Sequence, residues 1–191
     1  MIIVEQVVSS IIESLSAGGT LLYPTDTIWG IGCDATNADA VEKIYALKQR
    51  DHSKSMLVLC SDIAVVERFV SPVSDGARSL LLDGGRPTTV ILPAVHRLLA
   101  PNLLAADGTI GVRIPRMDFC LSLLQAFGRP IVSTSANLSG QPSPACFADI
   151  SARLLQSVDC CVPARFEEHK GGASSRIVKL QADGSLAVIR P

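Results

Sequence analysis

The chain has 191 residues, of which 48% are hydrophobic and 18% charged, and its formal net charge is −1. This length fits a single domain over residues 1–191 with a sizeable core, and the composition excludes a disordered chain. The balanced charge argues against an extended surface that coats nucleic acid, but it leaves a local basic cleft open because net charge does not report clustering.

The sequence shows no recognisable secretory or membrane-spanning signal. Residues 1–6 lack a basic lead and a long apolar run, so we expect no secretory signal. No stretch approaches the roughly 18 consecutive apolar residues of a membrane span, and we expect a cytoplasmic protein without membrane contact. Scattered cysteines without a C-x-x-C pair indicate buried free thiols. They are Cys33, Cys60, Cys120, Cys146, Cys160 and Cys161.

Helical and extended patterns alternate along the first half of the chain. Apolar residues share one helical face from Val7 to Leu15, and Gly18-Gly19 ends that helix. The next expected elements are a strand over 20–25, a helix capped by Asn37 or Asp39 and reaching about residue 49, a strand over 56–60, and a helix capped by Asp62.

Strands dominate the second half. We expect them over 89–92, 109–114, 130–134, 158–162, 175–180 and 186–189, with helices over 119–127 and 147–155. The last two strands form a hairpin through residues 182–184. The pattern predicts an α/β fold, a mixed sheet with helices on its faces, in one domain.

Three segments contain more polar and charged side chains than a purely structural role requires. In the first, residues 23–27, an extended chain would point Tyr23, Thr25 and Thr27 to one side. The glycines at 30 and 32 let other groups approach the backbone closely. A strand that ends in a polar turn is the other interpretation.

The second segment is cationic and runs from Lys48 to Lys54. Lys48 extends the apolar helical stripe of Val41, Ile44 and Tyr45, so its side chain must either reach the edge or lie over a cleft that holds an anion. The alternative is that these cations only stabilise the C-terminus of the helix through its dipole.

The third segment, residues 131–140, is rich in hydroxyl groups. Ser133, Ser135 and Asn137 share one face if the strand persists, at a strand end where α/β proteins commonly bind ligands. A Ser/Asn turn closed by Gly140 is the alternative.

Several common catalytic motifs are missing. The sequence contains no P-loop, no G-x-G-x-x-G fingerprint and no G-x-S-x-G elbow. The three histidines, His52, His96 and His169, lie far apart, which argues against a protein-ligated zinc or a serine triad. Cations and neutral hydrogen-bonding groups remain, and these suit phosphate and carboxylate.

The motifs together resemble the YrdC-like threonylcarbamoyl-AMP synthase family. They occur in order over about residues 12–189, and the ordered set is more specific than any one motif. The motifs are YPTDT at 23–27, GIGCD at 30–34, Lys48-x-Arg50, GVRIP at 111–115, STSANLSG at 133–140 and SRIV at 175–178.

The resemblance implies an open, curved mixed sheet with flanking helices and a positive concave cavity. The implied reaction joins L-threonine, bicarbonate and ATP into threonylcarbamoyl-AMP and pyrophosphate, for use by other proteins that modify adenosine in tRNA. It implies Mg²⁺ with the ATP and no assigned protein ligands. The implied catalytic residues are Lys48, Arg50, Ser135 and Asn137.

The implied binding residues fall into two groups. ATP would be bound by Lys48, Arg50, Ser133, Ser135, Asn137 and Ser175. Threonine would be bound by Thr25, Thr27, Lys54 and Arg113. The chain departs from the family at Asp51 and Ser55, where proline is frequent, and it resembles the short members without a further domain.

Two other functions stay open. One is a non-catalytic module of the same fold that binds double-stranded RNA or tRNA, against which stand the balanced charge and only eight aromatic residues. The other is a paralogue that acts on a different substrate.

Overall fold

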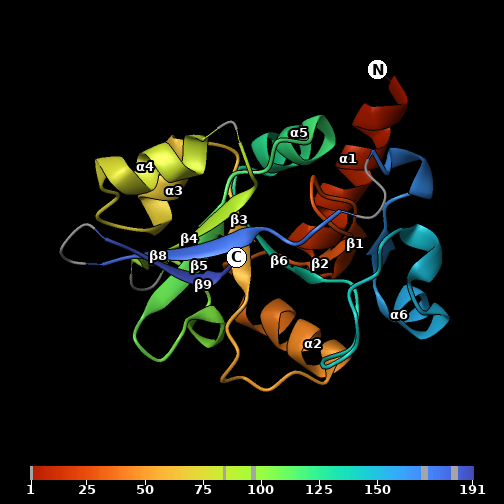
Figure 1. The fold of residues 1–191 in the computed structure, drawn as a ribbon. Helices are drawn as coiled ribbons and strands as arrows, with labels where there is room; N and C mark the ends of the chain where they lie inside the picture. The colour runs from red at the N-terminus through yellow and green to blue at the C-terminus, as the bar shows by residue number, and fades with distance from the viewer. Residues whose placement is uncertain (1, 84, 96–97, 169–171, 182–184) are drawn as a thin grey trace.

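An open mixed sheet organises the molecule (Figure 1). The computed structural model describes residues 2–83, 85–95, 98–168, 172–181 and 185–191, and in these the strand order is β7-β1-β2-β6-β3-β5-β4-β8-β9. Pairs β1/β7, β3/β5 and β4/β8 are parallel and the other neighbours antiparallel, which confirms the predicted mixed sheet. The strands are β1 Leu21–Tyr23, β2 Gly30–Gly32, β3 Leu57–Leu59, β4 Thr88–Pro93, β5 Thr109–Arg113, β6 Ile131–Ser135, β7 Cys160–Cys161, β8 Arg176–Leu180 and β9 Leu186–Arg190.

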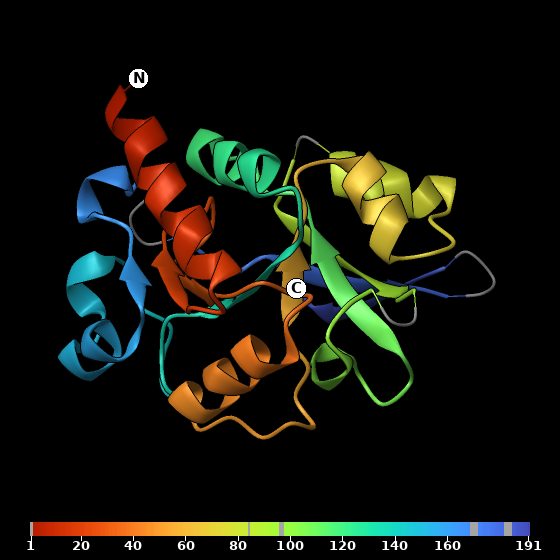
Figure 2. The ribbon, with the colours of Figure 1, turned by 180° about the vertical axis from the view of Figure 1, so that it is seen from behind.

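Helices cover the sheet from both sides. Figures 1 and 2 show α1 and α5 together on one side and α2 on the other. The predicted caps are confirmed: Asn37 accepts the Ala40 N–H at 3.1 Å, and Asp62 accepts the Val65 N–H at 2.9 Å. The helices are α1 Ile2–Ser16, α2 Ala38–Lys48, α3 Ile63–Phe69, α4 Asp75–Leu82, α5 Asp118–Phe127 and α6 Ala152–Ser157, with 3₁₀ turns η1 Pro101–Leu103, η2 Phe147–Asp149 and η3 Ala164–Phe166.

Strand alternation divides the central sheet into an apolar face and a polar face. In β4, β5, β6 and β8 most even-numbered apolar side chains enter the main core, while most odd-numbered side chains are small, hydroxylated or cationic. The second face packs in a second core where Leu59 and Ile131 meet α1 and α5, and its polar part lines a cavity. The even-numbered core residues are Val90, Leu92, Ile110, Val112, Val132 and Val178.

The structure shortens two predicted strands. The strand expected over 20–25 ends at Tyr23, because Pro24 has no N–H and the Thr25 hydroxyl then accepts the next free N–H groups in a turn. The strand expected over 158–162 is only Cys160–Cys161, because Asp159 exchanges side-chain hydrogen bonds with Thr20 in place of a longer ladder.

The helices expected and observed differ in two places. The helix expected over 147–155 is interrupted, because the Asp149 carboxylate turns back to the N–H groups of Ala145 and Cys146 while Ser151 caps a new helix. Helix α4 was not predicted from the sequence at all. The proposed hairpin turn at 182–184 lies outside the described residues.

The thiols divide into two groups. All six are free, and Cys33, Cys60 and Cys120 are buried as predicted, whereas Cys146 and Cys160 are partly exposed and Cys161 is exposed. The prediction of buried thiols is therefore right for half of them. Among the described residues, no helix is both long enough and apolar enough to cross a membrane.

Candidate active site

A cavity of about 230 Å³ opens on the polar face of the sheet. Segments that are far apart in the sequence form its walls, and the residue-50 region meets the residue-135 region there. Hydroxyl groups dominate the lining. They belong to Thr25, Thr27, Ser55, Thr89, Ser133, Thr134, Ser135, Ser143, Ser174 and Ser175.

Lys48 lies behind this cavity rather than in it. The residue is only 1% exposed, and the described lining includes Arg50 but not Lys48. Its ammonium donates to the Ser135 carbonyl, to the Asn137 carbonyl at 2.6 Å and to the Asn137 side-chain oxygen at 3.3 Å. Burial, and then the nearby Arg50, lower the pKa of Lys48 to about 8.

Arg50 enters the cavity because the chain reverses just before it. Gln49 ends α2 in the left-handed conformation, at φ 50° and ψ 44°. The Arg50 guanidinium donates to the carbonyls of Lys54 and Ser55, each at 2.9 Å, which fixes its direction. Burial lowers its pKa.

The end of β6 supplies two of the three predicted hydrogen-bonding side chains. Ser133 and Ser135 line the cavity, whereas Asn137 lies past the end of the strand and outside the described lining. Asn137 accepts hydrogen bonds from Lys48 and from the Ser135 hydroxyl, and donates to the Gln141 carbonyl. The shared face was expected only if the strand persisted to Asn137, and because the strand stops at Ser135, Asn137 does not share it.

The turn after β1 forms another part of the cavity wall. The Thr25 hydroxyl lies 2.8 Å from that of Thr27, and both residues line the cavity. Tyr23, expected on the same side, is instead buried in the core formed by α1 and α5. Tyr23 does not point to the same side as Thr25 and Thr27, because the extended chain ends at Tyr23.

Arg113 brings a buried cation to this wall. It is 3% exposed, forms an ion pair with Asp26, and donates to the Thr27 hydroxyl at 3.3 Å. Its buried Nε has no partner among the described residues. A buried donor of this kind is costly unless it is satisfied, and with almost no accessible surface this nitrogen is closed to the cavity.

The last strands contribute Ser175 and Arg190. The Ser175 hydroxyl lies 2.8 Å from that of Thr89, and Arg190 donates to the Ser175 carbonyl at 2.7 Å and 3.0 Å. Burial, and then Arg113 and Arg86, lower the pKa of Arg190. Sequence reasoning found Ser175 but missed Arg190, and the only signal was a cation at the end of the apolar strand 186–189.

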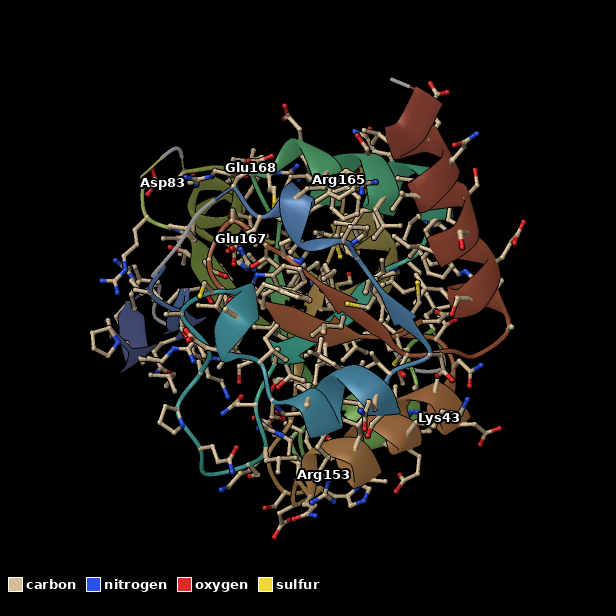
Figure 3. The ribbon with its side chains drawn as sticks, turned by 90° about the vertical axis from the view of Figure 1, so that its right-hand side faces the viewer. Lys43, Asp83, Arg153, Arg165, Glu167 and Glu168 are labelled. Atoms are coloured by element: carbon tan, nitrogen blue, oxygen red, sulfur yellow. The ribbon has the colours of Figure 1, made fainter. Side chains whose placement is uncertain are left out.

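Trp29 is a second lining residue that sequence reasoning missed. Its indole N–H donates to Glu167 at 2.6 Å, and its ring lies 4.9 Å from that of Phe147. Glu167, labelled in Figure 3, also accepts the Phe147 N–H at 2.8 Å. The sequence signal was that Trp29 is the chain's single tryptophan and adjoins the glycine motif.

Lys54 does not reach the cavity in this structure. Its side chain is exposed, and only its carbonyl takes part, as an acceptor for Arg50. Asp51, one of the two departures from the family pattern, accepts the Ser53 N–H at 2.8 Å and shapes the exposed loop. Ser55, the other departure, lines the cavity.

Cationic side chains outnumber acidic ones in the described lining of the cavity. Its described lining contains three arginines, Arg50, Arg113 and Arg190, and no carboxylate, and the neighbouring Asp26 is already paired. In the described part of the chain, no three His, Cys, Asp or Glu side chains gather as a metal site. The oxygen donors of the cavity fit a Mg²⁺ ion only if a phosphate-bearing ligand supplies most of its coordination.

Comparison with known proteins assigns the chain to a family. The Sua5_yciO_yrdC family, described as Telomere recombination, matches residues 13–191. A threonylcarbamoyl-AMP synthase of Stenotrophomonas maltophilia is 36% identical over 158 residues, which is 81% of this chain and 84% of the relative.

The chain belongs to the Sua5/YciO/YrdC family. The resemblance inferred from the sequence motifs is therefore confirmed. Escherichia coli YciO superposes with a TM-score of 0.83 at 26% identity, covering 97% of this chain and 88% of YciO.

A more distant Sua5/YciO/YrdC structure shares the fold. P. abyssi Sua5 complexed with L-threonine superposes with a TM-score of 0.84 at 22% identity, covering 96% of this chain. The chain spans about half, 53%, of that protein's length. These superpositions confirm the predicted α/β fold with an open mixed sheet and flanking helices.

Proposed function

We propose that this chain is a threonylcarbamoyl-AMP synthase, a nucleotidyltransferase that converts L-threonine, bicarbonate and ATP into threonylcarbamoyl-AMP and pyrophosphate. The product would serve tRNA-modifying transferase proteins in the cytoplasm, and residues 1–191 would act as one catalytic domain. Relatives that carry this name at 30–37% identity support the proposal.

The observation that carries the proposal is the composition of the cavity wall. Three arginines and a band of hydroxyl groups converge there without a carboxylate in the described lining. Guanidinium groups suit the paired oxygens of carboxylate and phosphate, and hydroxyl groups suit phosphate and ribose oxygens. This wall therefore fits a nucleotide and an amino acid better than it fits a neutral ligand.

The chemistry needs positioning more than a protein nucleophile. The threonine amine adds to bicarbonate with loss of water, and the resulting N-carboxylate attacks the α-phosphate of ATP with pyrophosphate as the leaving group. Two anions must approach, and one pair of like unit charges at 4 Å costs about 4 kcal/mol at an effective dielectric near 20. Fixed cations that offset this repulsion lower the barrier.

The residues divide the work by their place in the cavity. Arg50, Ser133 and Ser135 all line the cavity and would form a nucleotide wall that holds the triphosphate. Arg113, which lines the cavity beside Thr25 and Thr27, would take the threonine carboxylate.

Three candidates differ in support. Ser175 lines the cavity beside Arg190 and would contact the nucleotide there. Asn137 and Lys54 lie outside the described lining, so their contribution would act through Ser135 and through the Arg50 loop.

A Mg²⁺ ion would enter with the nucleotide. It would be held chiefly by phosphate oxygens and water, with hydroxyl groups of the cavity as its protein contacts, and it would neutralise phosphate charge.

The decisive experiment measures pyrophosphate release by the purified protein. We expect release that requires threonine, bicarbonate and ATP together, and a large loss in Arg113→Ala, with Arg153→Ala on exposed helix α6 as the control. Release that ignores threonine, or that prefers another amino acid, would contradict the proposed substrate.

The same preparation tests the RNA-binding alternative. Tight RNA binding that weakens steeply with salt, without ATP turnover, would favour that alternative over the synthase.

A further inference from the structure

The ammonium of Lys48 has three N–H donors, and all three point at oxygens of one short segment. Two of these oxygens are the carbonyls of Ser135 and Asn137, and the third is the Asn137 side-chain oxygen. An ammonium has three donors and no acceptor. No donor is left over for a phosphate oxygen in this arrangement.

The backbone of Lys48 holds the same segment from a second point. Its carbonyl accepts the Ser139 N–H at 3.0 Å, four residues beyond Ser135. The turn that follows β6 is thus attached to the last residue of α2 at both of its ends. Inside the turn, the Ser135 hydroxyl donates to the Asn137 side chain, so the orientation of that hydroxyl depends on Asn137.

Burial separates Lys48 from the ligand space. At 1% exposure it lies behind the described lining, whereas Arg50, two residues later, is part of it. The left-handed Gln49 turns these two cations in different directions.

We propose that Lys48 is a positioning residue, which holds Ser135 and Asn137 in the geometry that the nucleotide wall requires and does not itself contact the nucleotide. This inference rests on the proposed function for the identity of the nucleotide. A single buried nitrogen surrounded by three oxygens has a shape that an ammonium fills and a guanidinium fork does not.

Substitution by arginine separates positioning from contact. A lysine that binds phosphate directly is replaced by arginine with partial retention, because arginine also binds phosphate. A lysine that organises convergent carbonyls is not. We therefore expect Lys48→Arg and Lys48→Met to lose kcat/KM for ATP alike, by about 10²-fold. Retention of more than a third of wild-type activity by Lys48→Arg would overturn the proposal.

A double-mutant cycle with Asn137→Ala supplies the second readout. If Lys48 acts through this segment, Lys48→Met combined with Asn137→Ala is no worse than Lys48→Met alone. Losses that multiply would show an independent contact with the nucleotide and would contradict the proposal. The matched control is Lys43→Met, which removes an ammonium of the same helix that donates to the Gly18 carbonyl at 2.8 Å; Figure 3 labels Lys43 at the outside of the molecule.

The positioning role of Lys48 can also be tested if the protein shows no synthase activity. Trp29 is the single tryptophan and lines the cavity, so its fluorescence can report ATP binding, and the same cycle is then measured on Kd. Hydrogen exchange gives a further arm when a variant is unstable or ATP does not bind. Residues 136–141 should exchange faster in Lys48→Arg than in Lys43→Met, and equal rates would overturn the positioning role.

Discussion

At the scale of single residues, the backbone conformation of Gln49 directs the two neighbouring cationic side chains to different places. Gln49 adopts the left-handed conformation with an exposed side chain, and Lys48 and Arg50 on either side of it go to the core and to the cavity. The sequence showed both cations, but not the reversal between them, because glutamine is not a typical residue for this conformation.

Substitution of Gln49 tests this reversal. Glycine adopts the left-handed conformation freely, so Gln49→Gly should keep activity and raise the free energy of unfolding by up to about 1 kcal/mol. Gln49→Val should lower it by about 1 kcal/mol or more and raise KM for ATP, because a β-branched residue opposes a positive φ. Denaturant unfolding and steady-state kinetics measure both, and equal behaviour of the two variants would contradict the prediction.

The pKa of Lys48 predicts a pH dependence of stability. The unfolded group has a pKa near 10.5, and burial lowers it to about 8 in the folded protein. Between these values the unfolded chain binds a proton that the folded chain does not, so this group's contribution to stability rises with pH from 8 to 10.5 and is lost as pH falls through 8. A difference of one between the folded and unfolded pKa values corresponds to about 1.4 kcal/mol of stability.

The comparison with Lys48→Met isolates this effect. Buried thiols such as Cys60 and Cys120, whose pKa values burial raises to about 12, weaken both proteins equally above pH 9. We expect the stability of the wild type, relative to Lys48→Met, to increase from pH 7.5 to pH 10 in urea unfolding. A constant difference across this range would show that Lys48 titrates normally.

At the scale of elements, most of the fold could be predicted and its interruptions could not. Regular alternation or helical periodicity identified the central strands and α1, α2 and α5. Helix α4 escaped because it buries only Ala77 and Leu81 and contains a glycine. The break in the 147–155 helix depends on Asp149 bonding backward to the backbone, which no periodic pattern contains.

The segment before β8 shows how closely two elements approach at the site. A Cβ added at Gly172 would lie 1.8 Å from the Thr27 carbonyl oxygen, so this segment packs on the turn that follows β1. The same segment continues into Ser174 and Ser175 of the cavity lining. A change in its position therefore moves cavity groups.

Gly172→Ala should separate these two walls. We expect at least about a tenfold loss of turnover, because a displacement of an ångström in a positioned site is costly. Gly85→Ala, where the nearest neighbour of an added Cβ is 3.5 Å away, is the control and should retain activity. Wild-type kinetics for Gly172→Ala would mean that the backbone at Gly172 does not position the cavity.

At the scale of the whole molecule, the site could be predicted in part because its two richest segments carry motifs. Arg190 could not be predicted as a cavity residue, because its place depends on the parallel pairing of β8 with β4 and on the β8/β9 ladder. Those pairings join residues near 90 with residues near 177 and 190. The sequence patterns identified both strands but not their spatial order.

Removal of metal should abolish turnover without changing the thermal stability of the protein. Because the described residues contain no cluster of three metal-binding side chains, EDTA should leave the melting temperature of the ligand-free protein unchanged while it abolishes ATP turnover. Added Mg²⁺ and ATP should restore turnover and raise the melting temperature, with a gain of about 2.7 kcal/mol at a nucleotide concentration of 100 Kd. A melting temperature that falls in EDTA would reveal a structural ion.

The wide separation of the cavity walls along the chain has a kinetic consequence. The lining joins the turn at residues 25–30 to Ser174 and Ser175 and to strands β8 and β9, so a partly folded chain that lacks either part has no complete ligand site. Nucleotide should therefore slow unfolding and leave the refolding rate unchanged, which stopped-flow fluorescence with and without ATP can measure. Nucleotide would then protect folded molecules against unfolding, but it would not accelerate the folding of unfolded ones.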